Sequence, residues 1–313
     1  MFSSTSQAFT SLKAFQILLQ KLRPQILHAH EVFSPATTAT AARWLLGGTP
    51  VVVTAHRSGP IGDVQRLQQK LFGARRLQIF QRQVDKFIVI SREIGAELSG
   101  VGVPAERQVF IPNGVDTRHF APLTPAAKQQ VRQSLNLPSE ALVAIFTGRL
   151  AAEKRVNHLI NIWPTVRQQH PDAVLLIVGT GPEEAKLKQL AGAGVVFAGR
   201  CDDVAPYLQA ADVFVLPSVA EGLSVAMLEA MSSGLPAIVT QVGGAADVIS
   251  PGVNGYLIPP DDVPTLQQAV LTLFQSAELR ARLGQAARAV VERDYALPVI
   301  ARRLRQVYDD LLR

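Results

Sequence analysis

Two glutamates eight residues apart make the densest candidate site, within Pro-Ser-Val-Ala-Glu-Gly-Leu-Ser-Val-Ala-Met-Leu-Glu at 217–229. On one helix, at about 100° per residue, such positions would lie about 80° out of line. We expect Glu221 on a loop and Glu229 on a helix that begins near Ser224, so both can face a cleft beyond the preceding strand, where open α/β sheets bind ligands. Helix N-terminal amides around 222–224 would suit a phosphate. The alternative is a loop glutamate and an unrelated, solvated helix glutamate.

Two cations follow another apolar segment, in Phe-Thr-Gly-Arg-Leu-Ala-Ala-Glu-Lys-Arg at 146–155. An expected strand leads into Gly148, Arg149 comes next, and Lys154 follows five residues later. Arginine binds phosphate oxygens through two parallel hydrogen bonds and lysine acts as a point charge, so the two together can clamp a diphosphate. The alternative is that they cap a helix or lie on a solvated face.

Glycines mark two further loops. In Val-Gly-Thr-Gly-Pro-Glu-Glu at 178–184, the third glycine position of a dinucleotide fingerprint falls on Glu184, so the segment does not predict a Rossmann cofactor site. We expect a tight strand-to-helix turn there, with Gly179 close to a ligand as the alternative. Gly243 and Gly244 permit close backbone approach in a second loop, which is either a plain turn or a ligand loop.

Three histidines of the first half and the single cysteine are the residues that bear on a metal site. His56 ends an expected strand at 51–56 and is either structural or directed into an interdomain cleft. His28 and His30 share one face of a strand. They predict packing or cleft lining rather than a metal site, because no third ligand is evident. The single cysteine, Cys201, excludes an internal disulfide and a multi-cysteine metal site.

A basic stretch at 66–86 combines cations with interleaved apolar residues. The pattern is typical of a basic amphipathic helix pair that attracts anionic lipid or a phosphorylated acceptor. A merely solvated basic face is the alternative, and without a recognition motif the pattern does not favour nucleic acid. The cations are Arg66, Lys70, Arg75, Arg76, Arg82 and Lys86.

Short apolar segments alternate with longer helical patterns along the chain. Because these segments are apolar throughout, we expect parallel strands covered by helices on both faces. Two such sets, joined near 121–140, predict two doubly wound domains of the α/β class. The final segment, 296–312, has the apolar spacing of a helix. The strands are expected at 26–30, 51–56, 87–91, 109–112, 143–147, 174–178, 195–198, 213–217, 237–239 and 255–257.

Composition agrees with a globular chain of two domains. Its 313 residues correspond to about two domains at ~150 residues each, and 48% hydrophobic against 18% charged residues excludes disorder. Apolar runs do not exceed six residues, against the ~20 of a membrane span, and no signal peptide is evident, so we expect a cytoplasmic protein. Residues 1–140 hold 16 Lys and Arg against 8 Asp and Glu, whereas residues 141–313 hold 15 against 17, which suggests domains with different partners.

Taken in order, the segments from about residue 24 onward resemble retaining nucleotide-sugar glycosyltransferases of the GT-B fold. The resemblance is to the large "glycosyl transferases group 1" family, with its mannosyltransferase and glycogen synthase relatives, and covers about nine-tenths of the chain. Besides 24–30 and 41–56, it is carried by I-P-N-G-V-D at 111–116, G-R-L-x-x-E-K at 148–154, L-L-I-V-G-x-G-P-E at 175–183, A-D-V-F-V-L-P-S-x-x-E-G-L-x-x-x-x-L-E-A-M at 211–231 and G-G-x-x-D-V-I-x-x-G-x-N-G at 243–255.

The resemblance implies two Rossmann-like domains facing a cleft. Residues 1–130 would form the acceptor-side domain, 131–295 the domain that binds the nucleotide-sugar donor, and 296–313 a helix crossing back to the first domain. The implied reaction moves a sugar from a UDP- or GDP-sugar to a hydroxyl acceptor (a glycan, a lipid-linked acceptor or a small molecule), as in polysaccharide biosynthesis. The family retains the anomeric configuration and uses no catalytic metal or cofactor.

The resemblance also implies roles for individual residues. Arg149 and Lys154 match the clamp on the donor diphosphate. Glu221 matches the residue that contacts the donor sugar, Glu229 the one that holds the ribose, and His56 a histidine near the donor sugar. The implied catalytic set is Glu221, His56, Arg149 and Lys154, and the implied donor site comprises Gly148, Arg149, Lys154, Gly179, Glu221, Gly222, Leu223, Ser224 and Glu229.

Two departures from the family pattern bear on these expectations. Arg155 stands where the family usually has glycine, and it either crowds or reinforces the phosphate site. Only some 25 residues precede 26–30, and they predict one amphipathic helix. The opening strands and glycine-rich loop of the first domain are therefore expected to be absent, and 26–30 to form an exposed sheet edge through which two copies can pair.

Three functions compete at this point. The first is the glycosyltransferase, for which the resemblance implies same-face attack; a double displacement would instead need Glu221 as nucleophile. The second is a truncated homologue that binds nucleotide sugar but is non-catalytic or depends on a partner. The third is a sugar-nucleotide epimerase of similar fold, which the two glutamates argue against. For the first, the basic stretch adds a peripheral contact with the inner face of the membrane.

Overall fold

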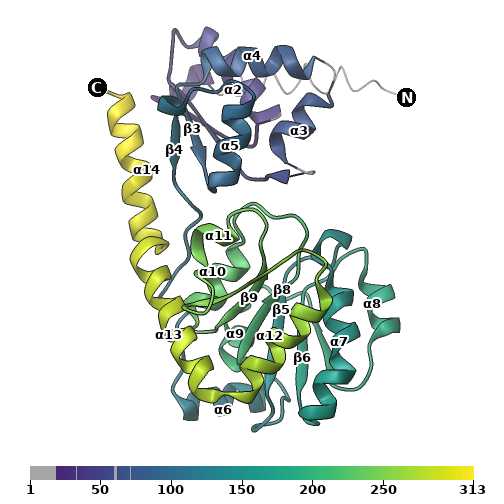
Figure 1. Ribbon diagram of the computed structural model, residues 1–313. Coiled ribbons are helices and arrows are strands. Elements are labelled where there is room, and N and C mark those ends of the chain that lie inside the picture. Colours follow the sequence, from purple (N-terminus) through teal and green to yellow (C-terminus); the bar gives the residue numbers. More distant parts are fainter. Residues whose placement is uncertain (1–18, 33, 60–61, 71) are drawn as a thin grey trace. The chain divides into compact units, whose positions relative to one another are not determined.

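The chain divides into two compact units (Figure 1). The computed structural model describes residues 19–313 apart from 33, 60, 61 and 71. Unit 1 comprises Met1–Pro112 and Arg302–Arg313, and unit 2 comprises Asn113–Ala301. The amphipathic helix expected before residue 26 lies mostly outside the described residues, and its last turn, 19–22, is helical.

The boundary between the units lies before Asn113, earlier than the expected position between residues 130 and 131. The reason is helix α6 (Pro125–Ser134), which packs in unit 2. Lys128 Nζ lies 2.7 Å from Asp212 Oδ1, and the buried Arg132 guanidinium lies 2.7 Å from Asp212 Oδ2. Asp212 also accepts a hydrogen bond from Val143 N at 2.8 Å, so one carboxylate joins α6 to the start of a central strand. The C-terminal part of unit 1 likewise begins at Arg302 rather than at 296.

Unit 1 is built on a four-stranded parallel sheet in the order β1-β2-β3-β4. Strand β2 (Val51–Ala55) is buried along its whole length, as an apolar strand covered on both faces should be. Strand β1 (Leu27–His30) pairs with β2 and lies at the edge of the sheet formed by the described residues. The other elements are α2 (Ser34–Leu45), α3 (Asp63–Gln68), α4 (Gly73–Gln83), β3 (Lys86–Val89), α5 (Arg92–Gly100), η2 (Ala105–Arg107) and β4 (Gln108–Phe110).

The basic stretch folds as two short helices, α3 and α4, which agrees with the helix pair that its pattern predicted. Phe72 has a left-handed φ of 59° between them. A Cβ on Gly73 would lie 1.9 Å from Leu67 O, so only glycine allows the chain to turn back this closely.

Unit 2 is built on a six-stranded sheet in the order β10-β9-β8-β5-β6-β7, with parallel pairing throughout. Strands β5 (Val143–Thr147), β6 (Val174–Val178) and β8 (Val213–Leu216) are buried along their whole length. The strand order reverses at β5, whose neighbours are β6 and β8, and open α/β sheets bind ligands at such a switch point. The other strands are β7 (Val195–Gly199), β9 (Ala237–Thr240) and β10 (Gly255–Ile258).

Helices fill the connections of unit 2, and the two parallel sheets confirm the expected α/β class. Within the described ranges, no helix combines the length and the apolar character needed to cross a membrane. After α6, the helices are η3 (Ala152–Lys154), α7 (Val156–Gln169), α8 (Glu184–Leu190), α9 (Ala205–Ala210), α10 (Val225–Ser232), α11 (Ala245–Val248), α12 (Val263–Gln275) and α13 (Ala277–Asp294). The last helix, α14 (Leu297–Leu311), begins in unit 2 and belongs to unit 1 from Arg302 onward.

Candidate functional site

The candidate site consists of loops at the carboxyl ends of β5, β6, β8 and β9 in unit 2. Backbone hydrogen bonds join the loops after β5 and β6: Gly148 N donates to Val178 O at 3.0 Å, and Leu150 N donates to Thr180 O at 2.9 Å. Gly179 has a φ of 131°, and a Cβ there would lie 1.9 Å from Gly148 O. The close approach of the two loops therefore accounts for glycine at 179 without invoking a ligand.

The loops after β8 and β9 are joined in a similar way. Gly244 N donates to Gly222 O at 2.6 Å. Gly243 has a φ of 58°, and a Cβ there would lie 2.2 Å from Gly222 O. Thr240 Oγ1 also donates to Ser218 O. The second glycine loop thus supports the loop that carries Glu221.

Lys154 and Glu221 meet directly, although 67 positions separate them in the sequence. Lys154 Nζ lies 2.6 Å from Glu221 Oε1, and the two side chains are only 20% and 14% exposed. Val219 N donates to Glu153 O at 2.8 Å and adds a backbone link between the two segments. The structure therefore brings together a cation and a carboxylate that the sequence had assigned to one site.

Arg149 follows β5 almost directly, and its side chain is exposed. In the part of the chain that the structure describes, no carboxylate forms an ion pair with it. A guanidinium without a carboxylate partner has both of its paired donors available for phosphate oxygens.

Arg155 differs from its neighbours because its side chain already has a partner. Arg155 Nε donates to Asp261 Oδ1 at 2.8 Å, and this hydrogen bond is the main cause that lowers the pKa of Asp261. Arg155 has a left-handed φ of 51°, a conformation that glycine adopts without strain. The backbone at 155 thus has a conformation that favours glycine, the residue that the resemblance led us to expect, and the Arg155 side chain is directed to Asp261.

Helix α10 begins at the candidate site. Ser224 caps it by accepting a hydrogen bond from Met227 N at 3.2 Å. Asn113 Nδ2 donates to Leu223 O at 2.9 Å and so holds the turn that precedes the cap. Asn113 belongs to the I-P-N-G-V-D segment at 111–116, and its contact with Leu223 was not predicted from the sequence. A small pocket beside this turn is lined by Leu216, Glu221, Gly222, Ser224, Met227, Val239, Thr240, Val242 and Ala245.

Glu229 is half-buried on α10. Burial and, after it, repulsion from the Asp203 carboxylate raise the pKa of Glu229 to about 7, while His119 acts in the opposite direction. His119 Nε2 lies 2.8 Å from Asp203 Oδ1. Neither neighbour was predicted from the sequence, because each lies far from Glu229 along the chain.

His56 lies in unit 1, just after β2, with a half-buried ring. Its backbone N–H donates to Oδ2 of the buried Asp63 at 2.8 Å, and its ring Nε2 lies 3.0 Å from His30 Nδ1. Burial is the main cause that lowers the pKa of His56, so the imidazole is neutral at pH 7. Two contacts, one to the backbone and one to the ring, therefore fix this residue.

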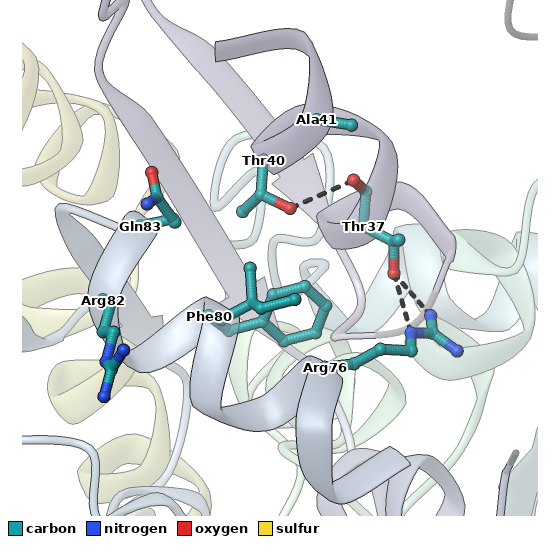
Figure 2. A pocket seen from close by; sticks show the side chains of 8 residues that line it. Thr37, Thr40, Ala41, Arg76, Phe80, Arg82 and Gln83 are labelled. Atoms are coloured by element: carbon teal, nitrogen blue, oxygen red, sulfur yellow. Dashed lines mark hydrogen bonds between the residues drawn. The ribbon is translucent and has the colours of Figure 1, made fainter. Parts of the chain in front are cut away.

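The basic stretch borders two pockets in unit 1. One, of about 390 Å³, lies between α2 and α4; in Figure 2 the Phe80 ring lies between the two helices and Arg76 points toward Thr37. Thr37 Oγ1 accepts a hydrogen bond from Arg76 Nε at 3.1 Å. The second, of about 360 Å³, shares Arg76 and is also lined by Arg66 and Lys70, with one acidic residue, Glu31. An apolar groove thus adjoins a cationic pocket.

The distribution of His, Cys, Asp and Glu side chains bears on whether the protein can hold a metal ion. Among residues 19–313, leaving out 33, 60, 61 and 71, no three His, Cys, Asp or Glu side chains form a group that could hold a metal ion. The candidate site instead offers cations and helix N-terminal amides, which are groups that bind anions.

Two family models match the chain. The one described as "Glycosyl transferases group 1" matches residues 141–276, and the one described as "Glycosyltransferase Family 4" matches residues 2–119. The first match contains Arg149, Lys154, Glu221 and Glu229, and the second contains His56.

Individual relatives point the same way. The chain is 31% identical over 286 residues to the sulfoquinovosyl transferase SQD2 of Arabidopsis thaliana, covering 88% of this chain and 54% of that protein. It is 34% identical over 209 residues to a GDP-mannose-dependent monoacylated alpha-(1-6)-phosphatidylinositol monomannoside mannosyltransferase of Corynebacterium glutamicum, covering 63% and 55%. The chain spans about half the length of these relatives. Anabaena Alr3699/HepE, solved in complex with UDP, shares the fold, with a TM-score of 0.84 at 20% identity over 96% of this chain and 82% of that one.

Proposed function

Because the chain belongs to the glycosyl transferases group 1 family, we propose that it transfers a sugar from a nucleotide diphosphate to a hydroxyl acceptor. The observation that carries this proposal is the 2.6 Å pair of Lys154 with Glu221 at the strand ends of unit 2. With the exposed Arg149, it supplies cations for a diphosphate and a carboxylate for a sugar hydroxyl.

The donor-binding roles follow from the chemistry of each group. Arg149 and Lys154 bind the diphosphate, and the amides of 222–224 add hydrogen bonds at the N-terminus of α10. Glu229 accepts hydrogen bonds from the ribose hydroxyls. The donor is a UDP- or GDP-sugar: a protein of the same fold has been solved with UDP, and a relative is described as GDP-mannose-dependent.

The proposed reaction retains the anomeric configuration and uses no metal. The bond between the anomeric carbon and the phosphate oxygen breaks, and its electron pair stays on that oxygen. The acceptor oxygen bonds to the same face of the sugar and its proton passes to the departing phosphate. Arg149 and Lys154 stabilise the charge that grows on the phosphate, as preorganised cations do in a site shielded from water.

Donor binding changes the Lys154–Glu221 pair. Lys154 turns from Glu221 to the diphosphate, and the released Glu221 carboxylate then accepts a hydrogen bond from the sugar. The free-state pair thus keeps both charges compensated until the donor supplies new partners. His56 takes the part that the resemblance implies, a contact with the donor sugar.

Unit 1 is assigned to the acceptor and to the membrane. The apolar groove and cationic pocket around Arg76 support a peripheral contact with an anionic membrane, at its cytoplasmic face, for a lipid-linked or glycan acceptor. The edge position of β1 supports pairing with a second copy.

The test is release of UDP or GDP from a panel of nucleotide sugars mixed with hydroxyl acceptors. Glu221→Gln and Lys154→Ala should each lower kcat/KM by about 100-fold or more, in the range found when one preorganised electrostatic group is removed. Lys188→Ala is the matched control, because Lys188 forms an ion pair of similar length, 2.7 Å, with Glu184 on α8. Unchanged rates in both site variants would refute the assignment.

The second hypothesis, a non-catalytic or partner-dependent homologue, would be supported if the wild-type chain binds the nucleotide but releases no UDP or GDP from any nucleotide sugar of the panel. Isomerised donor without acceptor would support the epimerase.

A further inference from the structure

Three histidines of unit 1 form a row across two neighbouring strands. His28 and His30 lie on β1, and His56 follows β2, which pairs with β1 in parallel. The ring centroids of His28 and His30 are 4.6 Å apart, those of His30 and His56 are 5.2 Å apart, and both pairs are stacked. The period of the strand explains the row, because residues two apart project to the same face.

One end of the row is fixed by hydrogen bonds at both nitrogens of His28. His28 Nδ1 lies 2.5 Å from the Tyr308 hydroxyl on α14, and His28 Nε2 lies 2.7 Å from Thr54 Oγ1. Burial is the main cause that lowers the pKa of His28 to about 4, so this ring is neutral at pH 7. A neutral imidazole has one donor and one acceptor, so a proton donated by Tyr308 to Nδ1 leaves Nε2–H to donate to Thr54.

The other end of the row is the contact between His30 and His56. His30 Nδ1 and His56 Nε2 are 3.0 Å apart, so one nitrogen carries the proton and the other accepts it. If His56 Nε2 donates, His30 keeps its own proton on Nε2, and His30 is the exposed residue at the end of β1. The backbone of His56 is separately held by Asp63. Among the described residues, nothing is hydrogen-bonded to His56 Nδ1.

We propose that His30 is a positioning residue for His56: it accepts the Nε2–H of His56 and so leaves Nδ1 as the nitrogen that meets the substrate. The Tyr308–His28 end fixes the stack on which His30 rests. The proposal deepens the proposed function, since the role of His56 toward the sugar rests on it.

Charge around the row favours this neutral arrangement. The charged and titratable neighbours of His56 act on its pKa in opposite directions. His30 and Arg57 lower the pKa of His56, and Glu31 raises it. His30 and His56 in turn lower the pKa of His28. Because burial and these neighbours lower the pKa of His56, its ring is neutral, and a neutral ring that donates through Nε2 has a hydrogen-bond acceptor at Nδ1.

The first test needs no variant and no activity. In the wild-type chain labelled with ¹⁵N, a coupling across the hydrogen bond should connect His30 Nδ1 with His56 Nε2, and the nitrogen shifts of His56 should show one tautomer with its proton on Nε2. Absence of that coupling, or a proton on His56 Nδ1, would overturn the proposal. Because this measurement is independent of catalysis, it can fail or succeed whether or not the proposed function holds.

The second test removes the nitrogen but keeps the stack. His30→Phe preserves a ring between His28 and His56, so the melting temperature should stay within a few degrees. The ¹⁵N spectrum of His56 should become that of mixed tautomers, and kcat should fall about 10- to 100-fold, with the donor KM nearly unchanged, since a misplaced reacting group costs rate more than binding. Tyr308→Phe, one ring further away, should lower kcat about threefold at most. Equal kcat and an unchanged His56 tautomer in His30→Phe would contradict the proposal.

Discussion

At the residue scale, the protonation of Glu229 predicts how nucleotide binding depends on pH. A ribose hydroxyl binds best to the ionised carboxylate, and the pKa of about 7 leaves half of it protonated at neutral pH. In the free protein this raised pKa contributes stability below about pH 4.5 that is lost as the pH rises through 7. Binding of UDP should therefore strengthen by up to about tenfold between pH 6 and pH 8, the one-proton limit for a pKa near 7.

The phosphate groups of the nucleotide also titrate, so variants are needed to isolate the contribution of Glu229 to the pH dependence of binding. Asp203→Asn removes the negative neighbour, so calorimetry should show the rise in affinity at lower pH. Asp202→Asn, at an exposed position one residue away, should leave the profile unchanged. Glu229→Gln should abolish this part of the pH dependence; a profile identical to that of the wild type in Glu229→Gln would show that Glu229 does not meet the nucleotide.

Arg155 predicts a stability effect without a functional one. A left-handed backbone costs a non-glycine residue roughly 1 kcal/mol, and an exposed ion pair such as that with Asp261 returns about 0 to 1 kcal/mol. Arg155→Gly should therefore raise the free energy of unfolding by about 0.5 kcal/mol in denaturant titrations. UDP affinity should not change, since the Arg155 side chain is directed to Asp261.

Asp261→Asn removes the ion pair with Arg155 without adding backbone strain, because asparagine tolerates the left-handed φ of 60° at position 261. This variant therefore measures the contribution of the ion pair alone. A loss of more than about 1 kcal/mol in Arg155→Gly would mean that the pair outweighs the backbone strain.

At the element scale, α4 predicts a position-dependent effect on membrane binding. Arg76 lines both pockets of unit 1, whereas its neighbour Arg75 lines neither. If the pockets take the headgroup and chain of an anionic lipid, Arg76→Glu should abolish sedimentation with vesicles that contain phosphatidylglycerol, and Arg75→Glu should weaken it only slightly. Equal losses would indicate a diffuse basic face, and no sedimentation of the wild type would refute the membrane contact.

Most elements could be predicted from the sequence, because their signals are local. Apolar runs such as 143–147 and 174–178 are strands with the expected bounds, and the cap at Ser224 starts α10 where the residue types indicated. A helix pair was expected in the basic stretch, but the position of the break between α3 and α4 could not be predicted, since it depends on how closely Gly73 approaches Leu67. The assignment of α6 to unit 2 likewise depends on Asp212, which lies 80 positions beyond Arg132.

The site shows the same division. The glutamates, cations and glycines were found from residue type and spacing. The partners of these residues could not be predicted, because they come from segments far apart in the chain. Examples are the pair of Lys154 with Glu221, the contact of Asn113 with Leu223 and the position of Asp203 near Glu229. Spacing indicates which residues can share an edge of a sheet, but only the packed loops decide which atoms touch.

At the scale of the whole molecule, two units divide the work that we propose. Unit 2 carries the groups for the donor, and it contains the whole match to the glycosyl transferases group 1 model. Unit 1 carries the histidine row and the basic pockets, which we assign to the sugar, the acceptor and the membrane. The charge difference between the two halves of the sequence agrees with this division.

The central claim is that the strand ends of unit 2 bind a nucleoside diphosphate, and calorimetric titration with UDP and GDP tests it most directly. The wild-type chain should bind one of them at a single site. Arg149→Ala should weaken that binding by about tenfold or more, the loss of about 1.4 kcal/mol expected for one charge-assisted phosphate contact. Arg293→Ala, which removes an exposed guanidinium from α13, should bind as the wild type does. No binding of either nucleotide, or equal affinities in the wild type and Arg149→Ala, would contradict the account.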